Sequence, residues 1–418
     1  MEEKVYACID FKSFYASVEC AERGLNPFST NLVVADETRG EGAITLAISP
    51  ALKSKGVKNR CRIFEIPKHI QYIKAMPRMK LYMEYSVEIY SIYLRYIAPE
   101  DIYIYSVDEC FIDLTPYLKL YNMRAKEIVI MIKEAIFKEK KIPSSAGIGT
   151  NLFLAKVALD VLAKKTEDGI GLLDLKRFKK YIWNHRPITD IWNIGKGIAK
   201  RLEKYKVYDL EGITLLQEKV LYDEFGENAL FLIDHAKGIE PCTIKEIKEY
   251  KSKTKSISNS QILFSDYNFE DAKMIMIEML DVLVLELIAF KYTTDNISLT
   301  IRYSGIERKT VGGNRKLYFR TNSFRKLSKE YKKFFDEKVD RKLKIKQITL
   351  SLNNLLEGAW IQGDLFSNYE LEKKDEKVQK AILKIKGKFG KNSILRGISM
   401  NEKATAKMRN KLIGGHNG

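Results

Sequence analysis

Three carboxylates at the ends of expected strands are placed to hold divalent metal ions. Asp10 follows the apolar run 5–9, and the adjacent pair Asp108 and Glu109 separates two further apolar runs, so that it would lie at a hairpin tip. Rigid strand ends position carboxylate oxygens well, and such hard oxygens are the ligands that Mg²⁺ prefers. Two ions about 4 Å apart catalyse phosphoryl or nucleotidyl transfer. The three acids therefore indicate metal-dependent transfer of a phosphate-bearing group.

Each of these acids alone has a more ordinary explanation. An isolated Asp at a strand end is more often a helix N-cap, and an Asp-Glu pair in a turn is usually solvated surface. Three anions that converge on one place are stable only around cations, because like charges repel. The residues around the acids decide between these interpretations.

The sequence around the acids resembles the two signature motifs of the Y-family DNA polymerases, which copy damaged templates. These are IDFKSFYASVE at 9–19 and SVDECFIDLT at 106–115. The similarity extends over nearly the whole chain and is greatest to the bacterial UmuC-like branch. It implies that Asp10, Asp108 and Glu109 are catalytic and bind two Mg²⁺ ions, which Mn²⁺ can replace, with an oxygen from the Phe11 carbonyl. Lys12 stands where the family often has an acid.

The same resemblance implies a nucleotide pocket. Tyr15 matches the steric gate that blocks a ribose 2′-hydroxyl, and Phe14 matches its neighbour against the nucleotide. Lys156, at the end of GIGTNLFLAK, matches a lysine that contacts the triphosphate. By periodicity alone, the two rings are core aromatics of a helix and a lone Lys on a helix is solvated surface.

The segment ISPALKSKGV at 48–57 departs from the family pattern. Pro50 and Lys53 stand where many members have Tyr and Arg. Lys53 keeps the nucleotide-binding charge but not the bidentate fork of arginine. We expect Arg60 or Arg62 to compensate.

The elements that must position these residues form an α/β pattern over about the first 165 residues. We expect helices near 13–23 and 83–97 and a short basic helix near Lys53. Strands are expected at 5–9, 32–35, 43–48, 61–65, 102–107 and 111–114.

From about residue 169 the pattern is helical, and IWNIGKG at 191–197 lies between two helical stretches. Gly195 and Gly197 would let backbone amides approach DNA phosphates, with Lys196 beside them. A tight turn between packed helices is the alternative for a lone G-x-G.

A polar, charged segment at 245–255 is the expected linker to another domain. After it we expect β-α-β-β-α-β, with strands at 256–264, 297–303, 316–320 and 345–352 and helices at 269–290 and 324–338. This is the order of a ferredoxin-like domain. Arg302 would lie with Ser298 and Thr300 on a polar sheet face that binds DNA.

The pentapeptide QGDLF follows the last expected strand, in what resembles a flexible tail. It is similar to the segment by which bacterial polymerases dock on the sliding clamp. Leu365 and Phe366 would fill an apolar pocket while Gln362 bonds at its rim. The alternative is an apolar pair that packs against the core.

Taken with the resemblance, the fold class is multidomain α/β (α+β), arranged as a right-hand polymerase. The ferredoxin-like palm is expected at 1–21 and 79–168, and the small fingers at 22–78. A helical thumb with a helix-hairpin-helix follows at 169–244, then the linker at 245–255. The β-α-β-β-α-β little finger is expected at 256–355, and a C-terminal tail with the clamp motif at 356–418.

Composition agrees with a nucleic-acid partner. The 418 residues carry 72 Lys and Arg against 54 Asp and Glu, a formal net charge of +18, which favours a polyanion. The most apolar stretch, 274–290, contains three acids and is expected to be a core helix rather than a membrane span. The acidic start lacks a secretory signal, so we expect a cytoplasmic location. The five cysteines form no C-x-x-C pair, which indicates reduced thiols.

We therefore predict a DNA-directed DNA polymerase for low-fidelity translesion synthesis, without a proofreading exonuclease. Primer-template DNA, deoxynucleoside triphosphates and a sliding clamp would be its partners, and it would act as a monomer without a membrane. A cyclase or another palm-domain nucleotidyltransferase would share the acids but has no use for the thumb, basic domain and clamp peptide. A non-catalytic, clamp-recruiting DNA scaffold is the third possibility, and loss of a metal carboxylate would favour it.

Overall fold

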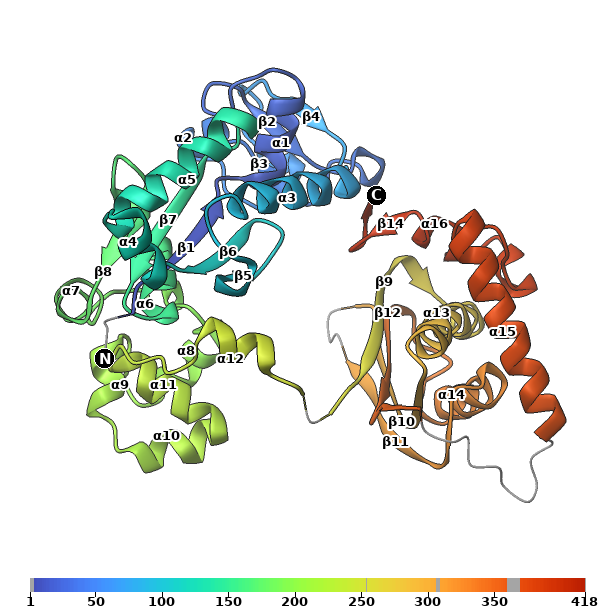
Figure 1. The fold of residues 1–418 in the computed structure, drawn as a ribbon. Coiled ribbons are helices and arrows are strands. Elements are labelled where there is room, and N and C mark those ends of the chain that lie inside the picture. The colour runs from blue at the N-terminus through green and yellow to red at the C-terminus, as the bar shows by residue number, and fades with distance from the viewer. Residues whose placement is uncertain (1–3, 253, 306–308, 359–368, 418) are drawn as a thin grey trace. The chain divides into compact units, whose positions relative to one another are not determined.

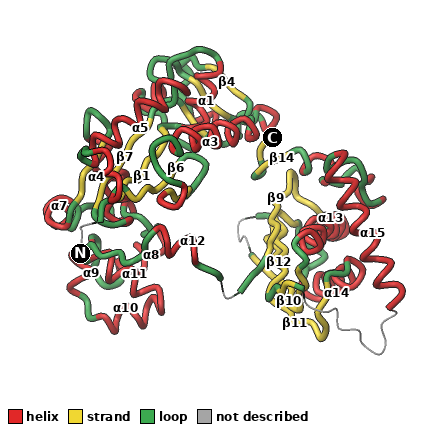
Figure 2. The backbone as a smooth tube through the Cα atoms, in the orientation of Figure 1, coloured by secondary structure: helices red, strands yellow, loops and turns green. Residues whose placement is uncertain are grey.

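The computed structural model of the chain describes residues 4–252, 254–305, 309–358 and 369–417. The chain divides into two compact units, Met1–Tyr250 with His416–Gly418, and Lys251–Gly415. The division falls inside the expected linker 245–255. The fold is mixed α/β in both units (Figure 2).

A five-stranded sheet forms the centre of unit 1 (Figure 1). β1 is antiparallel to its two neighbours, β6 and β7, whereas β7 and β8 are parallel. Five of the six residues of β1 are buried, as expected for a strand at the centre of a sheet. The strand order is β5 (Ile102–Ile104), β6 (Glu109–Asp113), β1 (Tyr6–Phe11), β7 (Ser144–Gly149) and β8 (Ile170–Leu173).

Helix α6 (Leu152–Val157) packs unusually close to this sheet. A β-carbon added to Gly147 would lie 2.1 Å from the Ala155 carbonyl oxygen, and one on Gly149 would lie 2.4 Å from the Ala155 nitrogen. Only glycine permits such an approach of helix to strand. A π-helical turn, η4 (Ala158–Leu162), and a 3₁₀ turn, η5 (Ala163–Lys165), follow α6.

The other helices of the sheet domain lie close to their expected positions. α1 spans Phe14–Glu22, and α3 spans Met79–Tyr93, which is about four residues earlier than expected. The remaining elements are η3 (Pro99–Asp101), α4 (Thr115–Tyr121) and α5 (Ala125–Lys140).

A small three-stranded sheet has the order β3 (Ala47–Ile48), β2 (Leu32–Val34), β4 (Ile73–Ala75). The expected strand 43–48 is therefore shorter, and β4 was not predicted. The strand expected at 61–65 is wrong, because Ile63–Glu65 forms the 3₁₀ turn η2, closed by the Arg62 amide donating to Glu65. Short turns also include η1 (Glu37–Arg39), and α2 (Pro50–Ser54) is the predicted basic helix.

The helical part of unit 1 packs in one apolar core with α6, η4 and β8. The turn at 191–197 joins a single 3₁₀ turn to α8, rather than two full helices. The first half of the expected linker is also helical, because a Thr243–Glu246 capping box begins α12. In order, the elements are α7 (Leu175–Tyr181), η6 (Ile188–Asp190), α8 (Lys196–Glu203), α9 (Leu210–Leu215), α10 (Glu218–Phe225), η7 (Gly226–Asn228), α11 (Ala229–Ala236) and α12 (Ile244–Glu249).

Unit 2 has the predicted β-α-β-β-α-β order. Its antiparallel sheet runs β11-β10-β12-β9, so that β12 separates the strands on either side of α13, as in a split β-α-β. Figure 1 shows α13 and α14 on one face of this sheet. The elements are β9 (Ile257–Tyr267), α13 (Phe269–Ala289), β10 (Tyr292–Tyr303), β11 (Thr310–Thr321), α14 (Phe324–Lys338), β12 (Ile345–Asn353) and β13 (Leu356–Glu357).

Residues 369–415 are folded as part of unit 2, in contrast to the flexible tail that we expected. α15 (Tyr369–Phe389) packs against α13, and η8 (Gly397–Met400), α16 (Ala406–Arg409) and β14 (Leu412–Ile413) follow. Two buried acids of α13, Glu278 and Asp281, bond to this segment. No helix in the described part is long and apolar enough to span a membrane.

Candidate active site

The register of two central strands brings the predicted metal ligands together. Asp10 and Glu109 are direct partners across β1 and β6. The Phe11 amide donates to the Asp108 carbonyl at 3.0 Å, which fixes the hairpin tip against the end of β1. The Ser106 hydroxyl donates to the Asp108 carboxylate at 2.6 Å. Three carboxylates therefore meet at one end of the sheet.

Electrostatics at this end favour a cation. Burial, and then the charges of Asp108 and Glu109, raise the pKa of Asp10 to about 7. A divalent ion would relieve this repulsion, because an opposite charge stabilises the ionised form. As the side chains stand, no group of three or more His, Cys, Asp or Glu in the described residues is arranged to hold a metal. Glu109 faces other partners.

Those partners are Lys156 and Cys8. The Lys156 ammonium lies 2.7 Å from Glu109 Oε1 and 3.0 Å from Asp160 Oδ1. The Cys8 thiol donates to the same Glu109 oxygen at 3.0 Å. Burial opposes the charge on Lys156, but Asp160, Cys8 and Glu109 outweigh it and raise its pKa. Lys156 is only 8% exposed, so the solvated-surface interpretation of this residue is wrong.

The predicted steric gate is braced by a second aromatic ring. The Tyr15 ring stacks on Tyr82 with centroids 4.6 Å apart, and Phe14 is buried between Phe11 and Tyr15. Burial and the Asp108 charge raise the pKa of Tyr15, while Arg60 lowers it. Tyr15 therefore lies in the electrostatic field of the carboxylates rather than wholly inside a core.

The cations of the 48–62 segment divide into two groups. The pKa of Lys53 is lowered by burial and Lys164, against the attraction of Asp10, so Lys53 lies in the field of the carboxylate end. Arg60 acts on Tyr15, whereas Arg62 donates to the Gly42 carbonyl at 2.7 Å. Arg60 is thus the better placed of the two arginines that we expected to compensate. Pro50 is the first residue of α2, capped by Ser49.

The remaining predicted residues lie elsewhere. Gly195 and Gly197 flank Lys196 at the start of α8, and both have open space where a β-carbon would stand. Arg302 is half-buried on β10 in unit 2. The clamp-binding residues Gln362, Leu365 and Phe366 lie outside the described residues.

Sequence reasoning missed three contributors. Asp160 could have been found from its position four residues after Lys156, which places both on one helix face. Cys8 had no signal beyond its position two residues before Asp10 on a strand. Trp192 donates to the Tyr105 hydroxyl at 3.2 Å and contacts the Phe111 ring, which ties the 191–197 turn to the β5–β6 hairpin.

Comparisons with known proteins agree with this geometry. The model of the impB/mucB/samB family matches residues 9–160, and the model of that family's C-terminal domain matches residues 254–365. The putative UV-damage repair protein UvrX of Bacillus subtilis is 30% identical, covering 98% of this chain and 96% of that protein. DNA polymerase IV 2 of the same organism is 29% identical, covering 100% and 99%.

A solved Y-family DNA polymerase chimera has the same fold. It superimposes with a TM-score of 0.63 at 19% identity, covering 85% of this chain and all of the chimera. This likeness confirms the predicted multidomain α/β architecture.

Proposed function

The chain belongs to the impB/mucB/samB family of Y-family DNA polymerases, and we propose that Asp10, Asp108 and Glu109 bind the two Mg²⁺ ions of its catalytic site. It is a DNA-directed DNA polymerase for translesion synthesis, with DNA and deoxynucleoside triphosphates as substrates and a divalent-metal requirement. The observation that carries the residue assignment is the pairing of Asp10 with Glu109 beside Asp108.

When bound, the ions would activate the primer 3′-hydroxyl and neutralise the leaving phosphates. Asp10 and Asp108 offer their carboxylates and Phe11 its carbonyl oxygen. Glu109 joins them once it exchanges its contact with Lys156. Mn²⁺ would serve in place of Mg²⁺ because both accept carboxylate oxygens.

Lys156 keeps a second anchor in Asp160, so it can leave Glu109 and still be held at the site. Its ammonium would then pair with the triphosphate, together with Lys53 and Arg60. Tyr15 would exclude a 2′-hydroxyl while Phe14 supports it from the core. In this assignment, Lys156 neutralises the Glu109 carboxylate before the substrate binds. It neutralises the triphosphate of the substrate afterwards.

The domain roles follow the family pattern. The proposal assigns the palm to 1–21 and 79–168, the fingers to 22–78, the thumb to 169–244 and the little finger to 256–355. Gly195, Lys196 and Gly197 would contact the phosphate backbone, as would Arg302 beside the hydroxyl and amide groups of the open sheet face. Gln362, Leu365 and Phe366 would bind a sliding clamp, and the polymerase would act as a monomer.

Primer extension tests the metal site. We expect the wild-type protein to extend a primer with Mg²⁺ or Mn²⁺ and all four deoxynucleotides, and Asp108→Ala/Glu109→Ala to bind the primer-template without extending it. The control is Asp223→Ala/Glu227→Ala, two exposed acids of the helical region, which should retain full activity. Extension by the Asp108 and Glu109 double variant would refute the assignment. DNA binding without extension by the wild type would favour a scaffold.

A further inference from the structure

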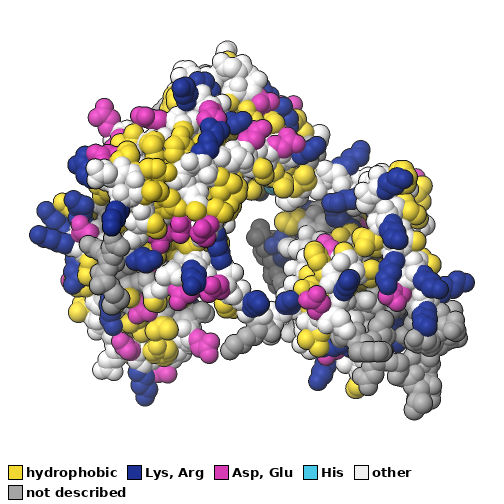
Figure 3. Space-filling model, in the orientation of Figure 1, with side chains coloured by type: hydrophobic (Ala, Val, Ile, Leu, Met, Phe, Trp, Pro, Cys, Tyr) yellow, Lys and Arg dark blue, Asp and Glu magenta, His cyan; other side chains and the backbone are white. Residues whose placement is uncertain are grey.

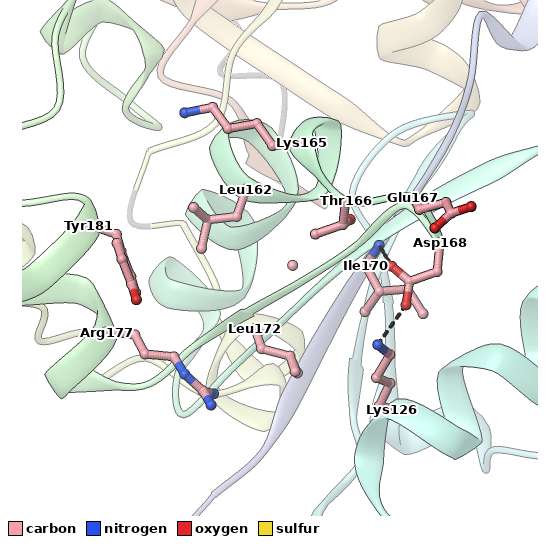
Figure 4. Close-up of a pocket in the computed structure, with 11 residues that line it drawn as sticks. Lys126, Leu162, Lys165, Thr166, Glu167, Asp168, Ile170, Leu172, Arg177 and Tyr181 are labelled. Carbon is pink, nitrogen blue, oxygen red and sulfur yellow. Dashed lines mark hydrogen bonds and ion pairs between the residues drawn. The ribbon is translucent and has the colours of Figure 1, made fainter.

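Three lysines converge on one short turn of unit 1, at residues 168–169. The Lys126 ammonium pairs with the Asp168 carboxylate at 2.6 Å, and Lys133 donates to the Asp168 carbonyl at 2.7 Å. The Lys12 ammonium lies 3.5 Å from the point where a β-carbon of Gly169 would stand. Figure 4 shows that the Asp168 carboxylate is already shared between Lys126 and the Ile170 amide.

Positive charge therefore exceeds negative charge at this turn. Asp168 pairs with Lys126, whereas in the described part of the chain Lys12 and Lys133 form no ion pair with a carboxylate. Burial first, and then the charges of Lys12 and Lys126 against that of Asp168, lower the pKa of Lys133 to about 8. Like charges held together in a partly buried place favour a bound counter-ion.

A wide-open, mostly apolar cavity of about 550 Å³ has Lys12 and Lys133 among its lining residues. This volume lies within the range of about 300–1,000 Å³ that is usual for small-molecule sites. Pro143 and Ser144 form part of its wall, and Glu134 and Lys138 stand at its exposed rim. The Phe28 and Phe137 side chains also line it and are 51% and 46% exposed. Exposed aromatic rings beside cations are the usual elements of nucleotide recognition.

We propose that this cavity binds a nucleoside monophosphate unit, with its phosphate between Lys12 and Lys133 and its base against Phe28 and Phe137. The unit comes either from a free nucleotide or from an unpaired nucleic-acid strand. The site is separate from the proposed polymerase centre, because Lys133 and Phe137 lie on α5, which contributes no metal ligand. Lys12 nevertheless connects it to the centre, because the Lys12 amide donates to the Pro143 carbonyl directly after Phe11.

Calorimetric titration of the full-length chain tests this site. EDTA is present throughout, so that metal-dependent nucleotide binding at the carboxylates is suppressed. The titrants are deoxyadenosine monophosphate, inorganic phosphate and a deoxyadenylate trinucleotide. The variants are Lys133→Ala, Lys133→Arg and Phe137→Ala, and the matched control is Lys119→Ala, an exposed lysine of α4. Thermal melting of each variant establishes that it is folded.

We expect Lys133→Ala and Phe137→Ala each to weaken binding of the monophosphate by about tenfold, because each removes a charged contact or a stacking surface. Lys133→Arg should retain most of the affinity and Lys119→Ala all of it. Tighter binding of the trinucleotide, lost in the same variants, would identify a strand as the source. Equal or weaker trinucleotide binding would identify a free nucleotide.

Two results would overturn the proposal. If folded Lys133→Ala and Phe137→Ala proteins bind the monophosphate as tightly as the control, the cavity is not the site. If inorganic phosphate binds as tightly as the monophosphate and Phe137→Ala has no effect, the site takes an anion without a base. Primer extension by Lys133→Ala, measured in parallel, shows separately whether the polymerase centre works.

Discussion

In the proposed mechanism, Lys156 connects substrate binding to the metal site through a single side chain. Its contact with Glu109 at 2.7 Å occupies an acid that the proposed mechanism assigns to a metal ion. Metal binding and the Lys156–Glu109 pair would therefore compete for the same carboxylate. Asp160 prevents the competition from releasing the lysine, because it holds the same ammonium at 3.0 Å.

Replacing this lysine with a neutral side chain of similar length should reveal the competition. In Lys156→Met, Glu109 is left beside Asp10 and Asp108 without a cation, so the metal-free protein should melt at a lower temperature. Mg²⁺ should then raise the melting temperature more than it does in the wild type. Nucleotide KM should rise by about tenfold or more, because a charged contact to phosphate is lost. Differential scanning fluorimetry and single-nucleotide kinetics measure both, with Lys119→Met as the control. Equal Mg²⁺ shifts in both proteins would show that Lys156 and metal do not compete.

Tyr15 should discriminate by steric exclusion, which its partner Tyr82 makes rigid. Tyr15→Ala is expected to raise incorporation of ribonucleotides relative to deoxynucleotides by roughly a hundredfold. Tyr82→Phe keeps the stacking ring that lies 4.6 Å away and should keep the discrimination. Competing incorporation of ribo- and deoxynucleotides at one template base measures the ratio. If Tyr15→Ala left the ratio of ribonucleotide to deoxynucleotide incorporation unchanged, Tyr15 would not be the steric gate.

Close packing of α6 on β7 is what places Lys156 at the carboxylates. The sequence predicted the identity of Lys156, because a motif is a local signal, but it did not predict β7 or β8, the strands that precede and follow this helix. It did not predict the Lys156–Glu109 pair, which depends on how near the helix approaches the sheet. Likewise, alternating apolar residues at 61–65 predicted a strand, but the Arg62–Glu65 bond closes a turn there.

Two glycine substitutions should separate packing from DNA contact. Gly147→Ala would place a β-carbon 2.1 Å from the Ala155 carbonyl oxygen, so α6 must move. We expect a loss of about 3 kcal/mol in stability and a loss of polymerase activity.

Gly197 lies inside α8 with open space around it, so Gly197→Ala should stabilise the fold by about 0.5–1 kcal/mol. Its primer-template affinity should nevertheless fall, because the added methyl obstructs phosphate approach. Urea unfolding and fluorescence anisotropy test the pair, and undiminished affinity in Gly197→Ala would argue against the DNA assignment.

A buried acid joins α1 to α3 below the Tyr15–Tyr82 stack. The Glu19 carboxylate accepts hydrogen bonds from Arg78 at 2.8 and 2.9 Å and from Tyr82 at 2.8 Å, and it also pairs with Arg23. Burial alone would raise its pKa, but these bonds outweigh burial and lower the pKa below its usual 4.5. The stabilisation is therefore present at neutral pH and is lost as the pH falls below 4.5 through the lowered pKa.

Glu19→Gln should consequently lower stability at pH 7 by about 2 kcal/mol, the usual size of a charged hydrogen-bond loss. The difference between the variant and the wild type should shrink as the pH falls below 4.5. Urea unfolding at several pH values between 7 and 3 measures it. Glu22→Gln, an acid on the same helix with one tyrosine hydrogen bond and a looser ion pair to Arg78 at 4.0 Å, is the control and should lose much less stability. A difference that grows toward low pH would contradict the assigned pKa direction.

Over the whole molecule, two units with separate apolar cores share a large positive charge. Figure 3 shows Lys and Arg side chains spread over the surface of both units. Charge could be read directly from composition, and so could the polyanionic partner. The packing of the C-terminal residues against α13 could not be predicted from the sequence. The partners of Glu278 and Asp281 lie more than a hundred residues further along the chain.

Removal of this C-terminal segment should destabilise unit 2 through the charges it leaves behind. Glu278 accepts from the Thr405 amide at 2.9 Å, and Asp281 lies 2.5 Å from Arg396 and 3.5 Å from Lys386. Deleting residues 369–418 leaves both acids without these partners beside an apolar helix. A loss of about 3–5 kcal/mol is expected, as for other broken buried ion pairs.

Neutralising the acids should have opposite effects in the two contexts. Glu278→Gln/Asp281→Asn should destabilise the full-length chain, because it removes charged hydrogen bonds. In the truncated chain the same pair should raise the melting temperature, since no unpaired charge is then left on α13. Thermal melting of the four proteins measures this reversal of sign. If the pair destabilised both chains equally, the acids would not be what anchors the C-terminal segment, and apolar contacts between α15 and α13 would have to carry that role.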